Sequence, residues 1–276
     1  MAKATADTRF ATPKPLKSHG PARIIAMCNQ KGGVGKTTTS INMSAALAEY
    51  GRKVLLIDFD PQGALSAGLG INAHDATTIY DLMLDRTIDP RSAIQNTDNP
   101  NLDVIPANIE LSAAEMKLVN EIAREQILAR ILKQVADDYD AIIIDCQPSL
   151  GLLTVNALTA AHGVIIPLAT EFFALRGVAI LEDIIGKVKE GLNPALQLDG
   201  ILATMVDNRT LHSREVLDRL KEAFGDKLFK TVIPRTVKFP DATVAQAPIT
   251  EFAPTSDAAE VYRTVAKELV ARGGVA

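Results

Sequence analysis

Short aliphatic runs alternate along this chain with longer segments in which apolar residues recur at the helical period. The runs that predict strands are Ile24–Asn29, Val54–Asp58, Leu102–Ile105, Ala141–Asp145, Gly163–Pro167, Gly200–Val206 and Thr231–Ile233. Runs of this kind are apolar on both sides of the strand, which is typical of a buried parallel sheet. The pattern therefore predicts an α/β fold: a doubly wound, mostly parallel sheet with helices on both faces.

Helical periodicity fills the stretches between these runs. In the first one, Lys36–Tyr50, the residues Ile41, Ala45 and Ala48 fall on one face, and Gly51 provides a C-terminal stop. Further helices are predicted at Glu121–Asp137, Leu152–Ala161, Leu175–Leu192, Ser213–Phe224 and Ala258–Ala271. Strands and helices in this order make consecutive βαβ units.

The start of the chain has a different composition from the rest. Met1 to Ala22 mixes Lys, Thr, Pro, Ser and Gly without apolar periodicity, which predicts a mobile tail of residues 1–22. No low-complexity linker divides the remainder, so residues 23–276 are expected to form one domain. No apolar run approaches the roughly 20 residues that a membrane span needs, and no signal peptide is visible. We expect a cytoplasmic protein.

Composition and charge narrow the classes of function. Hydrophobic residues make up 47% of the chain and charged residues 22%, as in soluble globular proteins. The net charge of −4 argues against a globally basic nucleic-acid binder but leaves a local basic patch open. Cys28 and Cys146 both lie inside apolar runs, so we interpret them as small core residues and not as a metal or disulfide framework.

A phosphate-binding loop is predicted between the first strand and the first helix. Residues 30–38 have the sequence QKGGVGKTT. Backbone N–H groups made available by Gly32, Gly33 and Gly35, the positive end of the helix dipole and the ammonium of Lys36 would hold phosphate, and the Thr37 hydroxyl can bind Mg²⁺. The full pattern G-x-x-x-x-G-K-[ST] is missed at one position, because Gln30 replaces its first glycine.

The K-G-G-x-G-K-T-T form resembles the deviant Walker A loop of the ParA and MinD family of P-loop ATPases, over about Ile24 to Ala271. The resemblance implies that Lys31 reaches across a sandwich dimer to the phosphates of the partner subunit, while Lys36 binds its own nucleotide. ATP binding and homodimerisation would then be linked. The nucleotide-binding residues implied in the loop are Lys31, Gly32, Gly33, Val34, Gly35, Lys36, Thr37 and Thr38.

Two carboxylates follow the second predicted strand, in the sequence VLLIDFDPQ of residues 54–62. Ligands of α/β sheets bind at this carboxyl end, and the period of two places Asp58 and Asp60 on one side of an extended chain. The family resemblance implies that Asp60 orients or activates the attacking water and that Asp58 supports the hydration shell of the metal. D-x-D-P is also good turn chemistry, so capping of the next turn stays an alternative.

A third carboxylate, Asp145, ends the aliphatic run of AIIIDCQPSLG at residues 141–151. This arrangement matches the Walker B pattern, in which the carboxylate holds Mg²⁺ through water. Gln147 stands where the family usually has proline, which leaves the shape of that turn open. The expected catalytic residues are Asp60, Lys31 and Lys36. The expected metal-binding residues are Thr37, Asp58 and Asp145. Phosphoryl transfer needs little beyond such positioned water, metal and charge.

Two further segments resemble ParA in particular. These are TEFFALRG from Thr170 and TVIPR at Thr231–Arg235. In the family, the second segment approaches the adenine ring, which implies a contact to ATP at Pro234. The resemblance extends this expectation to Asn208.

Basic residues are concentrated late in the chain. Residues 209–238 contain eight Lys or Arg against four Asp or Glu, a charge of +4 in a chain of −4. Arg209, Arg214, Arg235 and Lys238 lie where the family uses basic residues for DNA binding without sequence preference, which works by phosphate neutralisation. A solvated surface with scattered charges is the alternative.

The resemblance implies a slow Mg²⁺-dependent ATPase that partitions a chromosome or plasmid. Such a protein dimerises with ATP, associates with the nucleoid and is stimulated by a ParB-like partner. A MinD-like protein that acts on a membrane or on protein cargo is the main alternative. The last helix speaks against membrane binding, because its narrow stripe of Val261, Val265 and Leu269 suits docking on the core. Lys31 speaks against a metabolic phosphotransferase. The position of Cys146 speaks against a protein like the nitrogenase iron protein, which needs paired interface cysteines.

Overall fold

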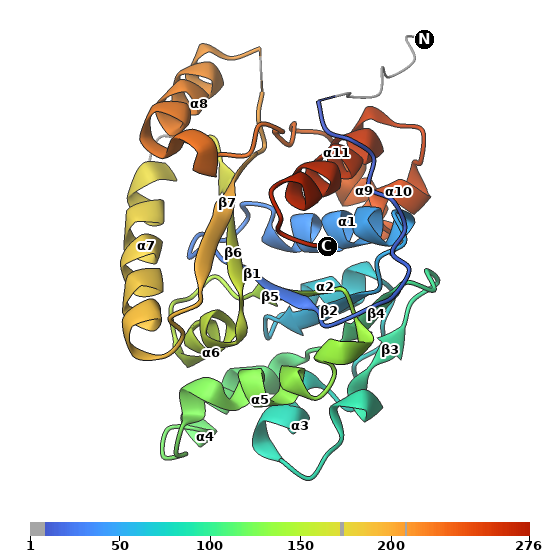
Figure 1. Cartoon of the computed structure of the whole chain (residues 1–276), viewed down its shortest axis with the longest axis vertical. Coiled ribbons are helices and arrows are strands. Elements are labelled where there is room, and N and C mark those ends of the chain that lie inside the picture. The colour runs from blue at the N-terminus through green and yellow to red at the C-terminus, as the bar shows by residue number, and fades with distance from the viewer. Residues whose placement is uncertain (1–8, 172–173, 208) are drawn as a thin grey trace.

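One sheet of seven strands organises the part of the chain that the structure describes, residues 9–171, 174–207 and 209–276 of a computed structural model (Figure 1). The strand order is β3-β4-β2-β5-β1-β6-β7, and all neighbours are parallel except β3 and β4. The strands are β1 Arg23–Met27, β2 Val54–Phe59, β3 Gln95–Asn96, β4 Leu102–Ile105, β5 Ala141–Cys146, β6 Gly163–Ala169 and β7 Gln197–Thr204. The predicted fold class is confirmed.

Helices cover both faces of the sheet and enclose two aliphatic cores. The helices are α1 Lys36–Glu49, α2 Ala64–Gly68, α3 Ile79–Leu84, α4 Ala114–Lys117, α5 Ile127–Lys133, α6 Leu152–Ala160, α7 Ala174–Gly191, α8 Leu211–Phe224, α9 Lys238–Val244, α10 Ile249–Phe252 and α11 Asp257–Ala271. One core lies under α1, α2 and α9 to α11, and the other under α3 to α8. Burial on both faces explains why the strands are aliphatic throughout.

The register of the central strands brings the predicted site together. Met27 at the end of β1 pairs with Asp145 of β5, and Asp58 of β2 pairs with Asp145 from the other side. Because parallel strands end at one edge of a sheet, the loops that follow β1, β2 and β5 lie side by side there. The same register brings the Sγ atoms of Cys28 and Cys146 to 3.2 Å from each other. Both thiols are free and buried, which agrees with their interpretation as small core residues.

The predicted helix Glu121–Asp137 is wrong in its extent, because only Ile127–Lys133 is α-helical. The chain enters from Ala123 at a positive φ of 55°. The buried side chain of Asn156 then binds the backbone on both sides of the start of α5. Its amide donates to the Arg124 carbonyl at 2.9 Å, and its oxygen accepts from the Leu128 N–H at 3.2 Å. A side chain from α6 thus takes the place of a longer helix.

The predicted strand Thr231–Ile233 is also wrong. Phe229 and Ile233 donate to β7 carbonyls, but the intervening backbone turns away from β7. The buried carboxylate of Glu268 in α11 accepts from the Lys230 N–H at 2.7 Å and the Thr231 N–H at 2.9 Å. Since these N–H groups are satisfied by a side chain, no strand ladder forms.

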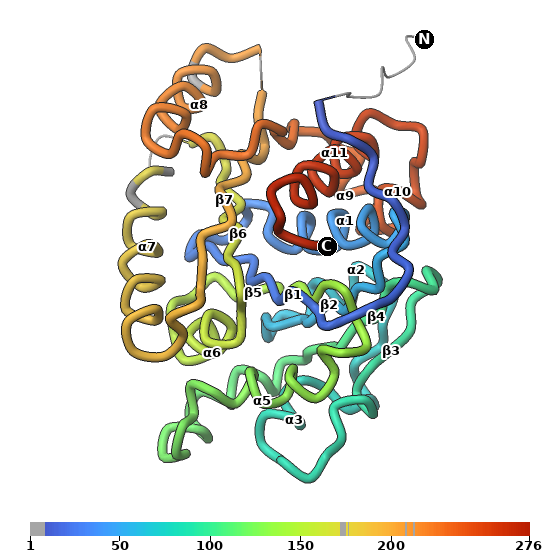
Figure 2. The backbone as a smooth tube through the Cα atoms, viewed as in Figure 1, coloured from blue at the N-terminus to red at the C-terminus, as the bar shows by residue number. Residues whose placement is uncertain are grey.

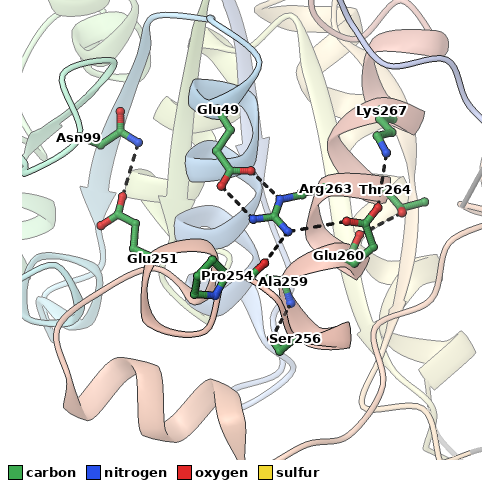
Figure 3. A network of polar contacts seen from close by, with 10 residues as sticks. All are labelled: Glu49, Asn99, Glu251, Pro254, Ser256, Ala259, Glu260, Arg263, Thr264 and Lys267. Atoms are coloured by element: carbon green, nitrogen blue, oxygen red, sulfur yellow. Dashed lines mark hydrogen bonds and ion pairs between the residues drawn. The ribbon is translucent and has the colours of Figure 1, made fainter. Parts of the chain in front are cut away.

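The last helix docks on the core, as its apolar stripe predicted. Val265 and Leu269 are fully buried in the same core as α1. At the rim of this contact, the Arg263 guanidinium forms a two-pronged ion pair with Glu49 at the end of α1 and also donates to the Pro254 carbonyl (Figure 3). Within the described residues, no helix is both long and apolar enough to cross a membrane.

Residues 9–22 run along the domain before they enter β1, as the blue end of the tube in Figure 2 traces. Buried Arg52 donates to the Lys14 carbonyl at 2.7 Å and to the carbonyl of the last residue, Ala276, at 3.0 Å. Asp140 accepts from the backbone of Gly20 at 3.0 Å and pairs with the ring of His19 at 2.7 Å. Division of the chain into a tail, 1–22, and one domain, 23–276, stays a prediction.

Short elements were not predicted from the pattern. These elements span too few residues to show a period: α2, α3, α4, α9, α10 and the two-residue β3. Of these, α9 is the one that matters most for the site.

Candidate functional site

The loop between β1 and α1 is built on glycine conformations. Gly33 and Gly35 have φ of 72° and 85°, which residues with a Cβ rarely adopt. A Cβ placed on Gly32 or Gly33 would meet nothing within 4 Å, so the space beside these two glycines is open. The loop ends at the amino terminus of the 14-residue helix α1, whose free N–H groups favour an anion.

The two lysines of the loop lie in different environments. Lys36 is buried, and its Nζ donates across the loop to the Lys31 carbonyl at 3.2 Å. The backbone N–H of Lys31 is bound by the side chain of Asn29 at 2.9 Å, but about half of the Lys31 side chain is exposed. Its ammonium forms an ion pair with Glu171, just after β6. Only Lys36 therefore serves the loop itself.

Asp145 offers a free oxygen beside the loop. Its Oδ1 accepts from the Ser40 hydroxyl at 3.0 Å, while Oδ2 is buried without a hydrogen-bond partner. Burial, and then the charge of Asp58, raise the pKa of Asp145 to about 7, whereas the nearby Thr37 hydroxyl, the hydrogen bond from Ser40 and the charge of Lys36 lower it. An unpaired buried carboxylate oxygen next to the Thr37 hydroxyl fits a divalent cation.

Asp58 and Asp60 both take part in the turn that follows β2. The buried Asp58 carboxylate accepts from the Ser66 N–H at 2.9 Å, the Ser66 hydroxyl at 2.7 Å and the Asp60 N–H at 3.3 Å. Burial raises the pKa of Asp58 to about 6 against these hydrogen bonds. Asp60 is half-buried and accepts from the Gln62 N–H at 3.0 Å. The turn-capping alternative thus describes their contacts, and their metal and water roles stay predictions.

Among the described residues, few side chains near the phosphate loop could coordinate a metal ion. No group of three or more His, Cys, Asp or Glu side chains that could hold a metal ion occurs among the described residues. Mg²⁺ usually keeps several waters and takes one or two carboxylates together with phosphate oxygens. The pair of Thr37 and Asp145 is consistent with this coordination of Mg²⁺.

A cavity of about 540 Å³ opens next to the loop. Its walls come from the loop, the end of β7, the segment before α9, α9 itself and α11; the lining residues are Gly35, Thr38, Thr204, Met205, Ile233, Pro234, Arg235, Thr236, Phe239, Pro240, Thr243, Val244 and Tyr262. The predicted residues Thr38 and Pro234 thus lie in one cavity. Asn208 lies outside the described residues.

Sequence reasoning missed part of this wall. Phe239 and Tyr262 meet edge to face with ring centroids 5.3 Å apart, and Tyr262 also contacts the Thr39 hydroxyl at 3.3 Å. Both are far from the loop in sequence, and isolated aromatics carry no spacing signal. Only packing brings them to the site.

Glu115 is another residue without a sequence signal. Its Oε1 accepts from the Leu153 N–H at the start of α6 at 3.1 Å and from the Gln147 side chain at 3.4 Å. A Cβ on Gly151 would lie only 2.3 Å from this oxygen. The unusual Gln147 therefore binds Glu115, and the turn after Asp145 is held against the segment that follows β4.

The four predicted DNA-contacting residues differ in how free their charges are. Arg209 donates to both oxygens of Asp207, at 2.9 Å and 2.8 Å, and holds the pKa of that carboxyl near 2. Arg214 is exposed on α8, Arg235 is exposed at the cavity, and Lys238 is exposed at the start of α9. The charge of Arg209 is therefore largely offset, which weakens its candidacy.

Known proteins resemble this chain over most of its length. A family model described as "AAA domain" matches residues 22–198. The protein Soj of Bacillus subtilis, described as a sporulation initiation inhibitor, is 49% identical over 252 residues, which cover 91% of this chain and 99% of Soj. The chromosome-partitioning ATPase Soj of Treponema pallidum is 46% identical over 252 residues, which cover 91% of this chain and 98% of that protein.

Solved structures agree in fold. A protein from Mycobacterium smegmatis described as cobyrinic acid a,c-diamide synthase, with bound ATP analogue and magnesium, is 40% identical with a TM-score of 0.80, over 92% of this chain and 96% of that one. The cell division ATPase MinD of Pyrococcus furiosus is 25% identical with a TM-score of 0.75, over 91% and 99%. By its identity to the Soj relatives over nearly the whole chain, and by its phosphate loop and sheet, this protein belongs to the Soj/ParA family of chromosome-partitioning ATPases.

Proposed function

We propose that this chain binds ATP and Mg²⁺ at the carboxyl edge of its sheet and forms a homodimer only with ATP. The dimer binds DNA without sequence preference in the cytoplasm, at the nucleoid. ATP hydrolysis, stimulated by a ParB-like partner, returns it to the monomer, and this cycle moves a chromosome or plasmid.

The observation that carries this proposal is the difference between the two lysines of the loop. Lys36 is buried and bonded within the loop, whereas Lys31 is half exposed and directed to Glu171. A loop that served one nucleotide alone would have no use for a second, outward ammonium. A second subunit that presents phosphates gives Lys31 a stronger partner, so ATP and dimerisation become coupled.

The residues of the site divide the work. Backbone N–H groups of residues 32–38 and the Lys36 ammonium bind the phosphates, and Thr37 and Asp145 would hold Mg²⁺, which supplies charge neutralisation when bound. Asp60 orients the attacking water. Pro234 and the apolar walls of the cavity receive the base.

DNA binding is assigned to the surface that carries Arg214, Arg235 and Lys238, with a smaller share for Arg209. Binding of this type rests on phosphate neutralisation and adds a slope of about −0.9 in log affinity against log salt for each neutralised phosphate. Two subunits on one rigid body double the contacts, so affinity rises with dimerisation.

DNA binding under different nucleotides tests the proposal. Fluorescence anisotropy with a random duplex should show binding with Mg²⁺ and ATP, little with ADP, and a steep loss with rising salt. Arg235→Ala should weaken binding for all sequences and flatten the salt slope. Lys133→Ala, the same charge change on the exposed side of α5, is the matched control.

Equal DNA binding with ADP and ATP, or none at low salt, would remove the DNA assignment and favour a MinD-like protein that positions another cargo. ATP turnover that requires a corrin substrate would instead favour the amide-forming activity named for the Mycobacterium smegmatis neighbour. The higher identity to the Soj relatives supports the partitioning role.

A further inference from the structure

The amino ends of three neighbouring strands meet at one buried carboxylate. Asp140 directly precedes β5, Lys53 directly precedes β2, and residues 9–22, here called the strap, lead into β1. The carboxyl ends of the same three strands carry the phosphate loop and the carboxylates of the candidate site. Only 3% of the Asp140 side chain is exposed, although it lies at the edge of the sheet opposite that site.

The contacts of Asp140 reach both neighbouring strands. Its Oδ2 accepts from the Lys53 N–H at 2.7 Å and lies 2.7 Å from Nδ1 of the His19 ring, and its Oδ1 accepts from the Gly20 N–H at 3.0 Å. The Asp140 N–H donates to the Lys53 carbonyl at 2.8 Å, and the Asp140 carbonyl accepts at 3.0 Å from the N–H of Arg23, the first residue of β1. One residue thus ties the starts of β2 and β1 to the start of β5.

The strap is fitted closely where it reaches Asp140. Gly20 has φ of 73°, and a Cβ on it would lie 2.2 Å from the Asp137 carbonyl oxygen, so this approach depends on glycine. Two residues later, the Ala22 N–H donates to the Ala136 carbonyl at 2.7 Å. The strap is therefore fixed to the segment that precedes β5.

The chemistry of the site needs groups from different strands at fixed separations. The loop after β1 binds phosphates by itself, whereas Mg²⁺ would be held between Thr37 of α1 and Asp145 of β5. Asp140 and Asp145 are about 16 Å apart at the rise of a parallel strand, so Asp140 can act only through the strands. A slide of β1 against β5 would move the loop relative to Asp145, and a displacement of about 1 Å can slow a reaction a hundredfold.

We propose that Asp140 is a positioning residue for ATP hydrolysis. Together with the strap, it fixes the amino ends of β1 and β2 against β5 and so holds the phosphate loop, the carboxylates that follow β2 and Asp145 at their working separations. The proposal rests on the proposed site for ATP and Mg²⁺. Loss of Asp140 or of the strap contact then impairs metal binding and turnover more than phosphate binding.

Two variants of the full chain test this. Asp140→Ala removes the carboxylate, and Gly20→Ala forces the strap away from Asp137. Titration calorimetry measures the affinity for ATP with and without Mg²⁺, and a steady-state assay measures kcat. Each variant should bind ATP without Mg²⁺ within about threefold of the parent, lose most of the gain in affinity that Mg²⁺ gives, and turn over about tenfold more slowly.

Tyr139→Phe is the matched control at the same edge of the sheet. It removes the hydrogen bond from the Tyr139 hydroxyl to Asp103 of β4, a strand that carries no residue of the predicted metal or phosphate site. This variant should keep the ATP affinity, the gain from Mg²⁺ and the kcat of the parent.

Melting curves check that the variants are folded at the assay temperature. Asp140→Ala leaves the N–H groups of Lys53 and Gly20 without their acceptor, so its melting temperature should fall. Gly20→Ala keeps the bond between Asp140 and Lys53, and it decides the question if Asp140→Ala does not fold.

A lower melting temperature with parent-like kcat and a parent-like gain from Mg²⁺ would overturn the proposal and leave Asp140 and the strap a role in stability alone. An equal loss of ATP affinity with and without Mg²⁺ would also overturn it, because the loop itself would then have moved. A parent protein that does not bind ATP refutes the proposed site, before any variant is compared.

Discussion

At the scale of single residues, Asp145 shows how a buried carboxylate is prepared for a cation. The aliphatic run that ends in aspartate predicts the residue, but its unpaired Oδ2 follows from packing between β1 and β2. Burial is the largest cause of its raised pKa, followed by the neighbouring charge of Asp58. A bound divalent cation would remove this penalty, which is why the arrangement suits a metal.

The raised pKa makes stability depend on pH. The folded protein keeps the Asp145 proton up to about pH 7, whereas the unfolded chain releases it near 3.8. Its contribution is therefore fully present below about pH 4 and is lost as pH rises to about 7. Asp145→Asn cannot ionise, so without nucleotide and Mg²⁺ its melting temperature should rise relative to the parent from pH 5 to pH 8.

Asp75→Asn is the matched control, because the Asp75 side chain is 90% exposed and its variant should follow the parent at every pH. Melting curves of Asp145→Asn that stay parallel to those of the parent across this range would mean that Asp145 is already ionised in the fold.

At the scale of elements, α11 decides the structure of a segment that lies far from it in sequence. The stretch that resembles a strand, Thr231–Ile233, has the right apolar composition but loses its ladder to Glu268. The same carboxylate also accepts from the Thr231 hydroxyl at 2.7 Å and pairs with Arg272 at 2.7 Å. α11 thereby holds the segment that leads into Pro234 and the cavity.

Removal of this carboxylate should cost much of the stability of the domain. Glu268→Ala leaves the buried N–H and hydroxyl of Thr231 and the part-buried N–H of Lys230 without a partner, so urea unfolding should show a loss of roughly 2–4 kcal/mol. Asp257→Ala removes an exposed carboxylate from the first turn of the same helix, and it should lose about 1 kcal/mol or less. Equal losses for the two variants would contradict the anchoring role of Glu268.

At the scale of the whole molecule, the proposed ATP-dependent dimer would give the two lysines of the loop different roles. Lys31→Ala removes an ammonium that the loop does not use, so the monomer should bind ATP almost as the parent does. It should fail to dimerise and fail to hydrolyse ATP, because no cation reaches the phosphates of the partner. Light scattering at several protein concentrations with ATP measures this.

Lys36→Ala serves as the contrasting variant and should lose nucleotide affinity outright, since the buried ammonium of the loop is gone. If an ATP-induced dimer survives in Lys31→Ala, the lysine does not act between subunits, and its ion pair with Glu171 is then its main role.

The local sequence pattern determined the parallel sheet, the phosphate loop, the position of Asp145 at the end of a buried strand and the docking of the last helix. These features depend on the spacing of apolar residues and on glycines at neighbouring positions, which a sequence displays directly. Within the described residues, the strands β1, β2, β4, β5 and β6 lie within two residues of their predicted ends.

Tertiary structure decided the rest. The cavity is assembled from β7, α9 and α11, the lost strand depends on Glu268, and the shortened α5 depends on Asn156. In each case a buried backbone group finds its partner, or an apolar wall its neighbour, on a segment distant in the chain. Hydrogen-bond donors must be satisfied but not by a particular element, so which side chain satisfies them is settled only when the chain is packed. The left-handed backbone of Met205, with φ of 53°, is the same kind of outcome. The Thr204 hydroxyl donates to the Val34 carbonyl and the Val206 N–H donates to the Ile233 carbonyl, so both neighbours of Met205 are fixed by distant segments.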